Sequence, residues 1–242
     1  MKLCMIGTGY VGLVSGVCFS DLGNTVYCVD NNKNKIDLLN DGKVPIYEPG
    51  LEEILKKNYK EKRLIFTTDL KKAVLNSDII FICVGTPTLK NSDSADLKYV
   101  FNAVKQLKKI ISRYKIIVTK STVPVCTGDK IEKILSNLIN KNLVDVVSNP
   151  EFLREGEAIR DFIHPDRVII GTNSKKANKI MNALYAPIVK KTSRYYNTSR
   201  RGAELIKYAS NAFLATKITC LLYTSDAADE GLGVDLGGRR II

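Results

Sequence analysis

The feature that most constrains this chain is a glycine-rich turn at its N-terminus. An apolar run, Leu3 to Ile6, leads directly into Gly7, Gly9 and Gly12, which have the spacing G-x-G-x-x-G. In a strand–turn–helix unit the first glycine permits a sharp turn, the second lets a pyrophosphate approach the backbone, and the third lets the helix pack closely on the strand. The following helix would direct its free N–H groups at the phosphates. The pattern therefore predicts a dinucleotide-binding βαβ unit.

An acidic residue closes the next apolar run. Asp30 follows Thr25 to Val29, which is where such units place a carboxylate that accepts hydrogen bonds from ribose hydroxyls. A carboxylate there would repel a 2′-phosphate, so NAD is favoured over NADP as the cofactor. A glycine turn with a purely structural role is the alternative. Strand, turn, helix and acid occur together, and this combination favours the cofactor site.

Strand-like and helix-like patterns alternate along the chain. Strands are expected at 2–6, 25–29, 64–67, 78–84, 115–120, 144–148 and 167–171. Helices are expected at 10–22, 33–41, 50–61, 70–76, 96–113, 127–140 and 174–185, with a longer one beginning near Arg200. Continuous apolar runs such as Ile79 to Val84 are typical of buried parallel strands, and Asp96 is a suitable N-cap. This alternation predicts an α/β fold with a doubly wound, mostly parallel sheet.

The chain divides into three parts. We expect a Rossmann-like NAD-binding domain over 1–197 and the start of a long central helix over 198–220. Residues 221–242 contain no lysine and no asparagine, yet they hold four of the sixteen glycines. A flexible tail is one interpretation. Because the change of composition falls inside a helical pattern, we favour a foreign or misread segment.

Charge and cysteine content limit the function classes. The net charge of +12 would suit nucleic acid, but the lysines occur in scattered doublets and form no single stripe with interleaved aromatic residues. Solvated helix faces explain them better, so no nucleic-acid partner is expected. No apolar run has the length of a signal peptide or a membrane span. The six cysteines include no C-x-x-C pair, so we expect a reduced, cytoplasmic protein without a metal site.

Two short motifs follow the fourth and fifth expected strands. Thr86 belongs to Val84-Gly-Thr-Pro87, and Thr122 belongs to Lys120-Ser-Thr-Val-Pro124. Ligands of doubly wound sheets bind at the carboxyl ends of the strands. We therefore expect both hydroxyls to face the cofactor, although plain strand-end turns are an equal alternative from the residues alone.

A denser motif, Asn149 to Gly156, follows the sixth strand. A carboxylate there could act as a general base, and Arg154 could bind an anion through its paired donors. The alternative is a helix start with Glu155 near the positive end of the helix dipole. His164, the only histidine, is expected in a turn without a nucleophile to pair with, which favours a structural role.

The helix expected from Arg200 carries a polar pair. Lys207 and Asn211 are four residues apart, so they lie on one helix face. A lysine beside an amide can stabilise a developing oxyanion. The alternative is that Lys207 and Asn211 are simply solvated, and the spacing alone favours this alternative.

Together these motifs resemble the nucleotide-sugar dehydrogenase family, from Met1 to about Ile218. Each motif is weak by itself, and their order carries the resemblance. The ordered set is Gly7–Gly12, Asp30, Val84–Pro87, Lys120–Pro124, Asn149–Gly156, Asp166–Gly171 and Glu204–Asn211. Glu151 to Arg154 and Asp166 to Val168 are more similar to members that act on UDP-glucose than to those that act on GDP-mannose or UDP-N-acetylmannosamine.

The family oxidises the C6 primary alcohol of the sugar to a carboxylate, with two hydride transfers to NAD and the aldehyde held on a cysteine. For this chain the resemblance implies oxidation of UDP-glucose to UDP-glucuronate. It implies cofactor contacts from Gly7, Gly9, Tyr10, Val11, Gly12, Asp30, Lys35, Thr86, Thr122 and Glu155. It implies substrate contacts from Glu151, Phe152, Leu153, Arg154, Lys207 and Asn211.

Four of these residues would be catalytic by the same resemblance. Thr122 and Glu151 would place the water used in proton transfer and thioester hydrolysis, and Lys207 and Asn211 would stabilise oxyanions at C6. Because the family dimerises through its central helix, we expect a homodimeric parent enzyme.

The cysteine pattern departs from the family. Its nucleophile lies in a Gly-Gly-x-Cys loop beyond the lysine–asparagine pair, whereas Cys220 comes too early and Gly237-Gly238 is followed by Arg239. We expect a truncated form that lacks the UDP-binding domain and completes no turnover. Its partial central helix would expose Leu205, Ile206, Ala209 and Phe213 and favour self-association. A related sugar specificity and a non-catalytic NAD-binding module remain the alternatives.

Overall fold

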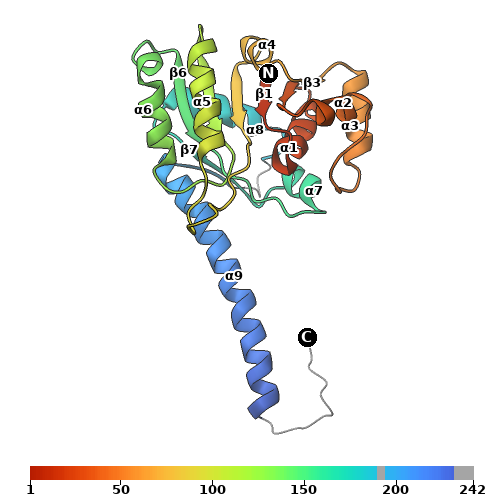
Figure 1. Ribbon diagram of the computed structural model, residues 1–242, viewed down its shortest axis with the longest axis vertical. Coiled ribbons are helices and arrows are strands. Elements are labelled where there is room, and N and C mark those ends of the chain that lie inside the picture. The colour runs from red at the N-terminus through yellow and green to blue at the C-terminus, as the bar shows by residue number, and fades with distance from the viewer. Residues whose placement is uncertain (190–193, 232–242) are drawn as a thin grey trace.

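The computed structural model describes residues 1–189 and 194–231 of the chain. Residues 232–242 of the atypical tail, including Gly237 and Gly238, lie outside the described residues. An α/β body carries one long helix, α9, which projects away from it (Figure 1).

One sheet runs through the α/β body, with the strand order β3-β2-β1-β4-β5-β6-β7-β8. Its strands are β1 (Lys2–Ile6), β2 (Thr25–Val29), β3 (Leu64–Thr67), β4 (Ile79–Ile82), β5 (Lys115–Thr119), β6 (Val144–Ser148), β7 (Arg167–Gly171) and β8 (Arg194–Thr198). All neighbours pair in parallel except β6 and β7, which pair antiparallel at Ser148 and Gly171. The expectation of a doubly wound, mostly parallel α/β sheet is confirmed.

Helices cover both faces of the sheet. They are α1 (Tyr10–Asp21), α2 (Lys33–Asn40), α3 (Leu51–Lys60), α4 (Leu70–Leu75), α5 (Lys98–Ile110), α6 (Thr127–Ile139), α7 (Ala158–Ile163), α8 (Lys175–Tyr185) and α9 (Arg200–Gly231). Alternate strand residues face opposite sides: Leu3 and Met5 pack with α1, α3, α7 and α8, whereas Cys4 and Ile6 pack with α4, α5 and α6. β4 is therefore buried and apolar at every position, as its sequence indicated.

The aromatic centre of the first core layer lies under α1. The ring of Phe19 packs 5.4 Å from Phe81 of β4, 4.8 Å from Phe162 of α7 and 5.5 Å from Tyr185 of α8, measured between ring centroids. Aromatic pairs at such distances add attraction beyond their buried area. This cluster joins the N-terminal βαβ unit to the segments that follow β6.

The antiparallel β7 changes the geometry of one end of the sheet. Ser148 and Gly171 are the last residues of their strands and pair with each other. Two antiparallel strands that meet at their last residues overlap little, so β7 and its parallel neighbour β8 extend past the carboxyl end of β6. They form a wall beside the edge where the parallel strands end.

The first turns of α9 pack against β7 and α6. Ala203 and Glu204 are buried there, and Arg200 Nη2 lies 2.5 Å from the Glu132 carboxylate and 3.4 Å from Asp129. From Asn211 to Leu221 the helix is exposed on every side. Leu205, Ala209 and Phe213 are exposed, as expected for a central helix seen in part, while Ile206 is half-buried.

The observed elements differ from the expected ones in three places, and one of these, the cap at Asp96, is a correction. The structure adds the strand β8 and the short helix α7, neither of which was expected, because five and six residues carry too little periodicity to be recognised. Asp96 does not cap α5: the N-cap is Leu97, and Asp96 Oδ1 accepts a hydrogen bond from the Lys98 amide at 2.9 Å. Finally, α9 continues through the change of composition at residue 221 as far as Gly231.

Among the described residues, no helix combines the length and apolarity that a membrane span requires.

Candidate active site

The glycine-rich turn joins β1 to α1 at the carboxyl edge of the sheet. Gly7 has a φ of +97°, and a Cβ on Gly12 would lie 1.9 Å from the Gly7 carbonyl oxygen, so both positions require glycine. A Cβ on Gly9 would meet no atom within 4 Å. Gly9 is also the N-cap of α1, and no side chain of the described residues caps that helix end. Open space before uncapped N–H groups fits a dinucleotide pyrophosphate.

Asp30 lies beside this turn at the end of β2. Its carboxylate accepts hydrogen bonds from the Thr8 amide at 2.9 Å, the Thr8 hydroxyl at 2.8 Å and the Asn32 amide at 3.0 Å, and it pairs with Lys35 Nζ at 3.2 Å. Burial would raise the pKa of Asp30, but these hydrogen bonds and Lys35 lower it below its ordinary value. Asp30 and Lys35, which the resemblance gave as separate cofactor contacts, thus lie against each other, and Thr8 is a partner of Asp30 that the glycine spacing did not indicate.

The motifs after β4 and β5 contact each other. The Thr86 hydroxyl donates to the Thr122 carbonyl oxygen at 2.8 Å, and the Ser121 hydroxyl donates to the Val84 carbonyl oxygen at 2.6 Å. Adjacent parallel strands end at the same edge, which explains why two motifs that are 36 residues apart meet. Thr86 and Thr122 therefore lie together at the carboxyl edge, as expected.

The loop after β6 brings a carboxylate to α9. Glu151 Oε1 lies 3.1 Å from Lys207 Nζ, and both side chains are only 10% exposed. The other carboxylate oxygen accepts a hydrogen bond from the Leu153 amide at 2.7 Å. Thr122 and Lys207 also line one small cavity of about 10 Å³. Three of the four expected catalytic residues are therefore neighbours.

The fourth, Asn211, lies in a larger groove with Lys207. This groove has a volume of about 950 Å³, and it lies between α9, the β7–β8 wall and the loop after β6. Phe152, Leu153 and Arg154 line it, so the expected substrate residues, Glu151 apart, share one surface. Its charged lining residues are all cations, namely Arg154, Arg167, Lys207 and Lys217. Such a lining favours an anionic ligand.

Arg154 has a different partner from the one its sequence context suggested. Its backbone N, Nε and Nη2 bind the Asp161 carboxylate at 2.9, 3.0 and 2.7 Å. The paired donors that could bind an external anion are therefore engaged by α7. Glu155 is exposed, and it is near enough to the turn that its charge helps to raise the pKa of Tyr10.

A buried polar cluster lies behind the loop and was not expected. Lys120 Nζ is 3.5 Å from both Asn149 Oδ1 and the Tyr185 hydroxyl, which donates to Asn149 Oδ1 at 2.5 Å. Burial lowers the pKa of Lys120. Lys120 lines a cavity of about 340 Å³ together with His164, which caps the C-terminal end of α7. His164 lies in the short connection between α7 and β7, and the sequence held no signal that these segments would meet.

A sequence model of the UDP-glucose/GDP-mannose dehydrogenase family, NAD binding domain, matches residues 1–189. The chain belongs to this family. A UDP-glucose 6-dehydrogenase of Rhizobium meliloti is 47% identical over 99% of the chain, and one of Bacillus subtilis is 47% identical over 97%. The chain spans about half the length of these curated relatives, 57% and 50% respectively.

Solved structures of the family show the same fold. A GDP-mannose dehydrogenase of Pseudomonas aeruginosa has a TM-score of 0.91 and 37% identity, and its match covers 97% of this chain and 54% of that one. A UDP-glucose dehydrogenase of Pyrobaculum islandicum has a TM-score of 0.86 and 36% identity, covering 96% and 56%. The UDP-glucose/GDP-mannose dehydrogenase family is thus supported by both sequence and fold, and the chain corresponds to the NAD-binding, N-terminal half of its relatives.

Proposed function

We propose that this chain is the cofactor-binding half of an NAD-dependent UDP-glucose 6-dehydrogenase, which oxidises UDP-glucose to UDP-glucuronate in the cytoplasm. The observation that carries the proposal is the buried Glu151–Lys207 pair. It joins the loop after β6 to α9 beside a cation-lined groove, within the same carboxyl edge as the glycine turn. The high identity to UDP-glucose 6-dehydrogenases supports the choice of sugar.

The residues around the turn would hold NAD, which accepts hydride when bound. Gly7, Gly9, Val11 and Gly12 would form the pyrophosphate cradle, and Tyr10 would lie against it. Asp30, with Lys35 and Thr8 beside it, would bind the adenosine ribose. Thr86, Thr122 and Glu155 would border the nicotinamide side, because they follow the strands beyond the point where the sheet order reverses.

The groove along α9 would hold the nucleotide sugar. Phe152, Leu153 and Arg154 would contact it along one wall, and the cationic lining would offset the charge of its diphosphate. Lys207 and Asn211 would donate hydrogen bonds to an oxygen at C6 as negative charge develops there. Glu151, together with Thr122, would orient a water and accept its proton.

The chain alone would bind ligands without completing the four-electron oxidation. Cys4, Cys18, Cys28 and Cys83 are buried, and burial raises the pKa of each thiol, so they are poor nucleophiles. No cysteine within the described residues lines the groove with Lys207 and Asn211. The exposed apolar residues of α9 would pair with a second copy in a homodimeric parent enzyme.

Binding measurements on the purified chain test this proposal. Calorimetry should detect binding of NAD. NADP should bind at least about tenfold more weakly, which is a difference of about 1.4 kcal/mol in binding free energy. The chain alone should develop no NADH absorbance with UDP-glucose. With the nucleophile and the UDP-binding domain restored, the protein should reduce NAD with UDP-glucose in preference to GDP-mannose.

Each contrary result has a specific meaning. Preference for GDP-mannose would move the protein to that sister activity, which its close structural match makes the second candidate. NAD binding with no sugar-dependent reduction of NAD by the restored protein would favour a non-catalytic NAD-binding module. Absence of NAD binding would refute the proposal.

A further inference from the structure

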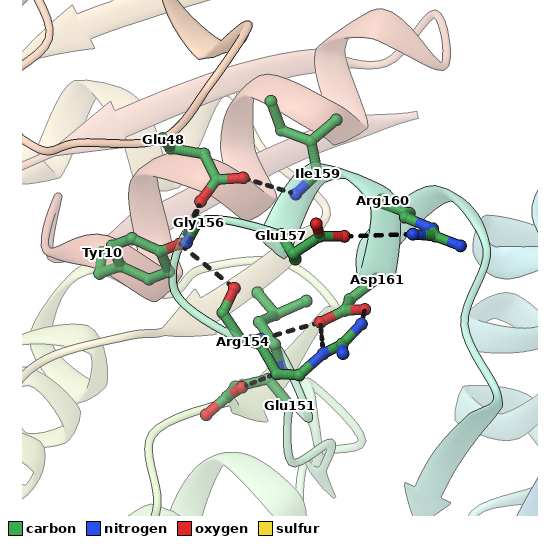
Figure 2. A network of polar contacts seen from close by, with 10 residues as sticks. Tyr10, Glu48, Glu151, Arg154, Gly156, Glu157, Ile159, Arg160 and Asp161 are labelled. Atoms are coloured by element: carbon green, nitrogen blue, oxygen red, sulfur yellow. Dashed lines mark hydrogen bonds and ion pairs between the residues drawn. The ribbon is translucent and has the colours of Figure 1, made fainter.

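The cofactor turn and the loop after β6 share a buried carboxylate that the sequence patterns did not single out. Glu48 precedes α3 and is only 7% exposed. It accepts hydrogen bonds from the Tyr10 hydroxyl, from the Gly156 amide at 2.9 Å and from the Ile159 amide at 3.2 Å. In Figure 2, Glu48 and Tyr10 point toward Gly156 from one side, and Ile159 lies beyond it. Three segments far apart in the sequence therefore meet at one side chain.

Tyr10 connects this contact to the glycine turn. It is the first residue of α1, directly after Gly9, and its hydroxyl also accepts a hydrogen bond from the Gly156 amide at 3.0 Å. Burial, and then the hydrogen bond to Glu48, raise the pKa of Tyr10 to about 12, so the hydroxyl keeps the proton that it donates. A movement of the N-terminus of α1 would thus be transmitted to the loop through the Tyr10 side chain.

The loop is also fixed at Arg154, whose side chain binds the Asp161 carboxylate of α7. Between these two fixed points lies Glu155, and Glu151 with its ion pair to Lys207 lies just before them. Figure 2 shows the contact of Glu48 with Gly156 and that of Asp161 with Arg154 on the same stretch of backbone. The Glu48 contact is the one that reaches the cofactor turn.

We propose that Glu48 is a positioning residue that couples NAD binding at the glycine turn to the placement of the loop from Glu151 to Gly156. Its carboxylate holds the Gly156 end of the loop against the first residue of α1. The loop is thereby kept at the nicotinamide side of the cofactor, with Glu155 beside the turn. This inference rests on the proposed location of NAD.

The test compares two ligands on the intact chain. AMP carries only the half of NAD that Asp30 would bind, whereas NAD extends past Tyr10 toward the loop. Glu48→Gln puts an amide donor against backbone N–H donors, so we expect NAD to bind about tenfold more weakly and AMP to bind within about twofold of the unaltered chain. Glu52→Gln makes the same charge change on exposed α3 surface and should alter neither ligand.

Further measurements separate positioning from stability. Hydrogen exchange of the Gly156 and Ile159 amides should quicken in Glu48→Gln. Tyr10→Phe keeps the ring and the two amide contacts, so we expect about a threefold loss for NAD alone. If Glu48→Gln does not fold, the NAD and AMP affinities of Tyr10→Phe test the proposal.

The inference fails if both variants bind NAD as tightly as the unaltered chain, or if NAD and AMP weaken equally. Should the unaltered chain itself bind no NAD, the proposed function fails as well. The two failures are therefore distinguishable.

Discussion

The two halves of the candidate site are built by different physical means. The cofactor turn consists mainly of backbone, and the sterics at Gly7 and Gly12 determine its shape within twelve residues of the N-terminus. The groove is made of side chains from the loop after β6, from β7 and β8, and from α9. Its shape depends on contacts between distant segments. Substitutions should therefore disrupt the two halves in different ways.

The largest effect is expected in the cofactor turn. In Gly12→Ala the new Cβ would lie 1.9 Å from the Gly7 carbonyl oxygen, so the strand–helix contact must open. We expect unfolding to become easier by about 3 kcal/mol and NAD binding to be lost. Thermal melting and calorimetry measure the two effects.

Gly9→Ala is the matched control for that variant. Its Cβ meets no protein atom within 4 Å, so the melting temperature should be almost unchanged. NAD should nevertheless bind about a hundredfold more weakly, because the methyl group would occupy the approach of the pyrophosphate. Unchanged NAD affinity in Gly9→Ala would contradict the proposed cradle.

The same difference explains what the sequence could predict. Gly7, Gly12 and Asp30 obey a local spacing, and a buried parallel strand such as β4 is recognisable from its own residues, so the glycine turn and the acid beside it were predicted from the spacing of the motif. Lys207 and Asn211 were correctly expected on one helix face. Nothing in that spacing showed that Glu151 would pair with Lys207.

The unpredicted features all depend on tertiary contacts. The short β8 and α7 gain their stability from their neighbours, and Glu48 is held by amides more than a hundred residues later. Arg154 pairs with Asp161 only because α7 packs where it does. Residues of this kind carry no periodic signal, and the structure is required to find them.

In the groove, the largest effect should come from breaking the Glu151–Lys207 pair. Lys207→Met would leave the Glu151 carboxylate nearly buried without its cation, so we expect a loss of about 2–3 kcal/mol in the free energy of unfolding. Urea denaturation measures this loss, and NAD affinity should change less than about threefold.

Two further variants sharpen that measurement. Glu151→Gln combined with Lys207→Met should recover at least half of the lost stability, because neither charge is then left unpaired. Glu157→Gln breaks the exposed ion pair with Arg160 and should cost less than about 0.5 kcal/mol. Equal losses from Lys207→Met and Glu157→Gln would show that the pair in the groove is no more important than a surface contact.

A smaller effect is expected at Asp30. Asp30→Asn removes the charge beside Lys35 while keeping the size of the side chain, and we expect a loss of about 1 kcal/mol in stability at pH 7. NAD should bind about tenfold more weakly, and the preference over NADP should narrow. Calorimetry with both cofactors at one ionic strength measures the change, and an unchanged preference would remove Asp30 from cofactor selection.

The pH dependence of that stability difference has a defined sign. The pKa of Asp30 is lower in the folded chain than its ordinary value of 3.8, so the unfolded chain binds the proton more readily. The stability that the carboxylate adds is therefore complete above pH 3.8 and is lost as the pH falls through the lower folded value. Denaturation of the unaltered chain and of Asp30→Asn should show a constant difference in the free energy of unfolding from pH 7 to pH 5. Below pH 4 this difference should become smaller.

The smallest effect on stability is expected on α9, where the body no longer supports the helix. Leu205 is 56% exposed and Ile218 is 52% exposed, and neither lines the groove. Replacing both by glutamate should change the free energy of unfolding by less than about 0.5 kcal/mol, since exposed positions contribute little packing. It should still reduce self-association measured by light scattering, while NAD affinity stays the same. Tyr99→Ser, which removes an exposed aromatic side chain from α5, is the control and should leave self-association unchanged. A monodisperse monomer before any substitution would show that the exposed helix drives no association, and α9 would then act only as one wall of the groove.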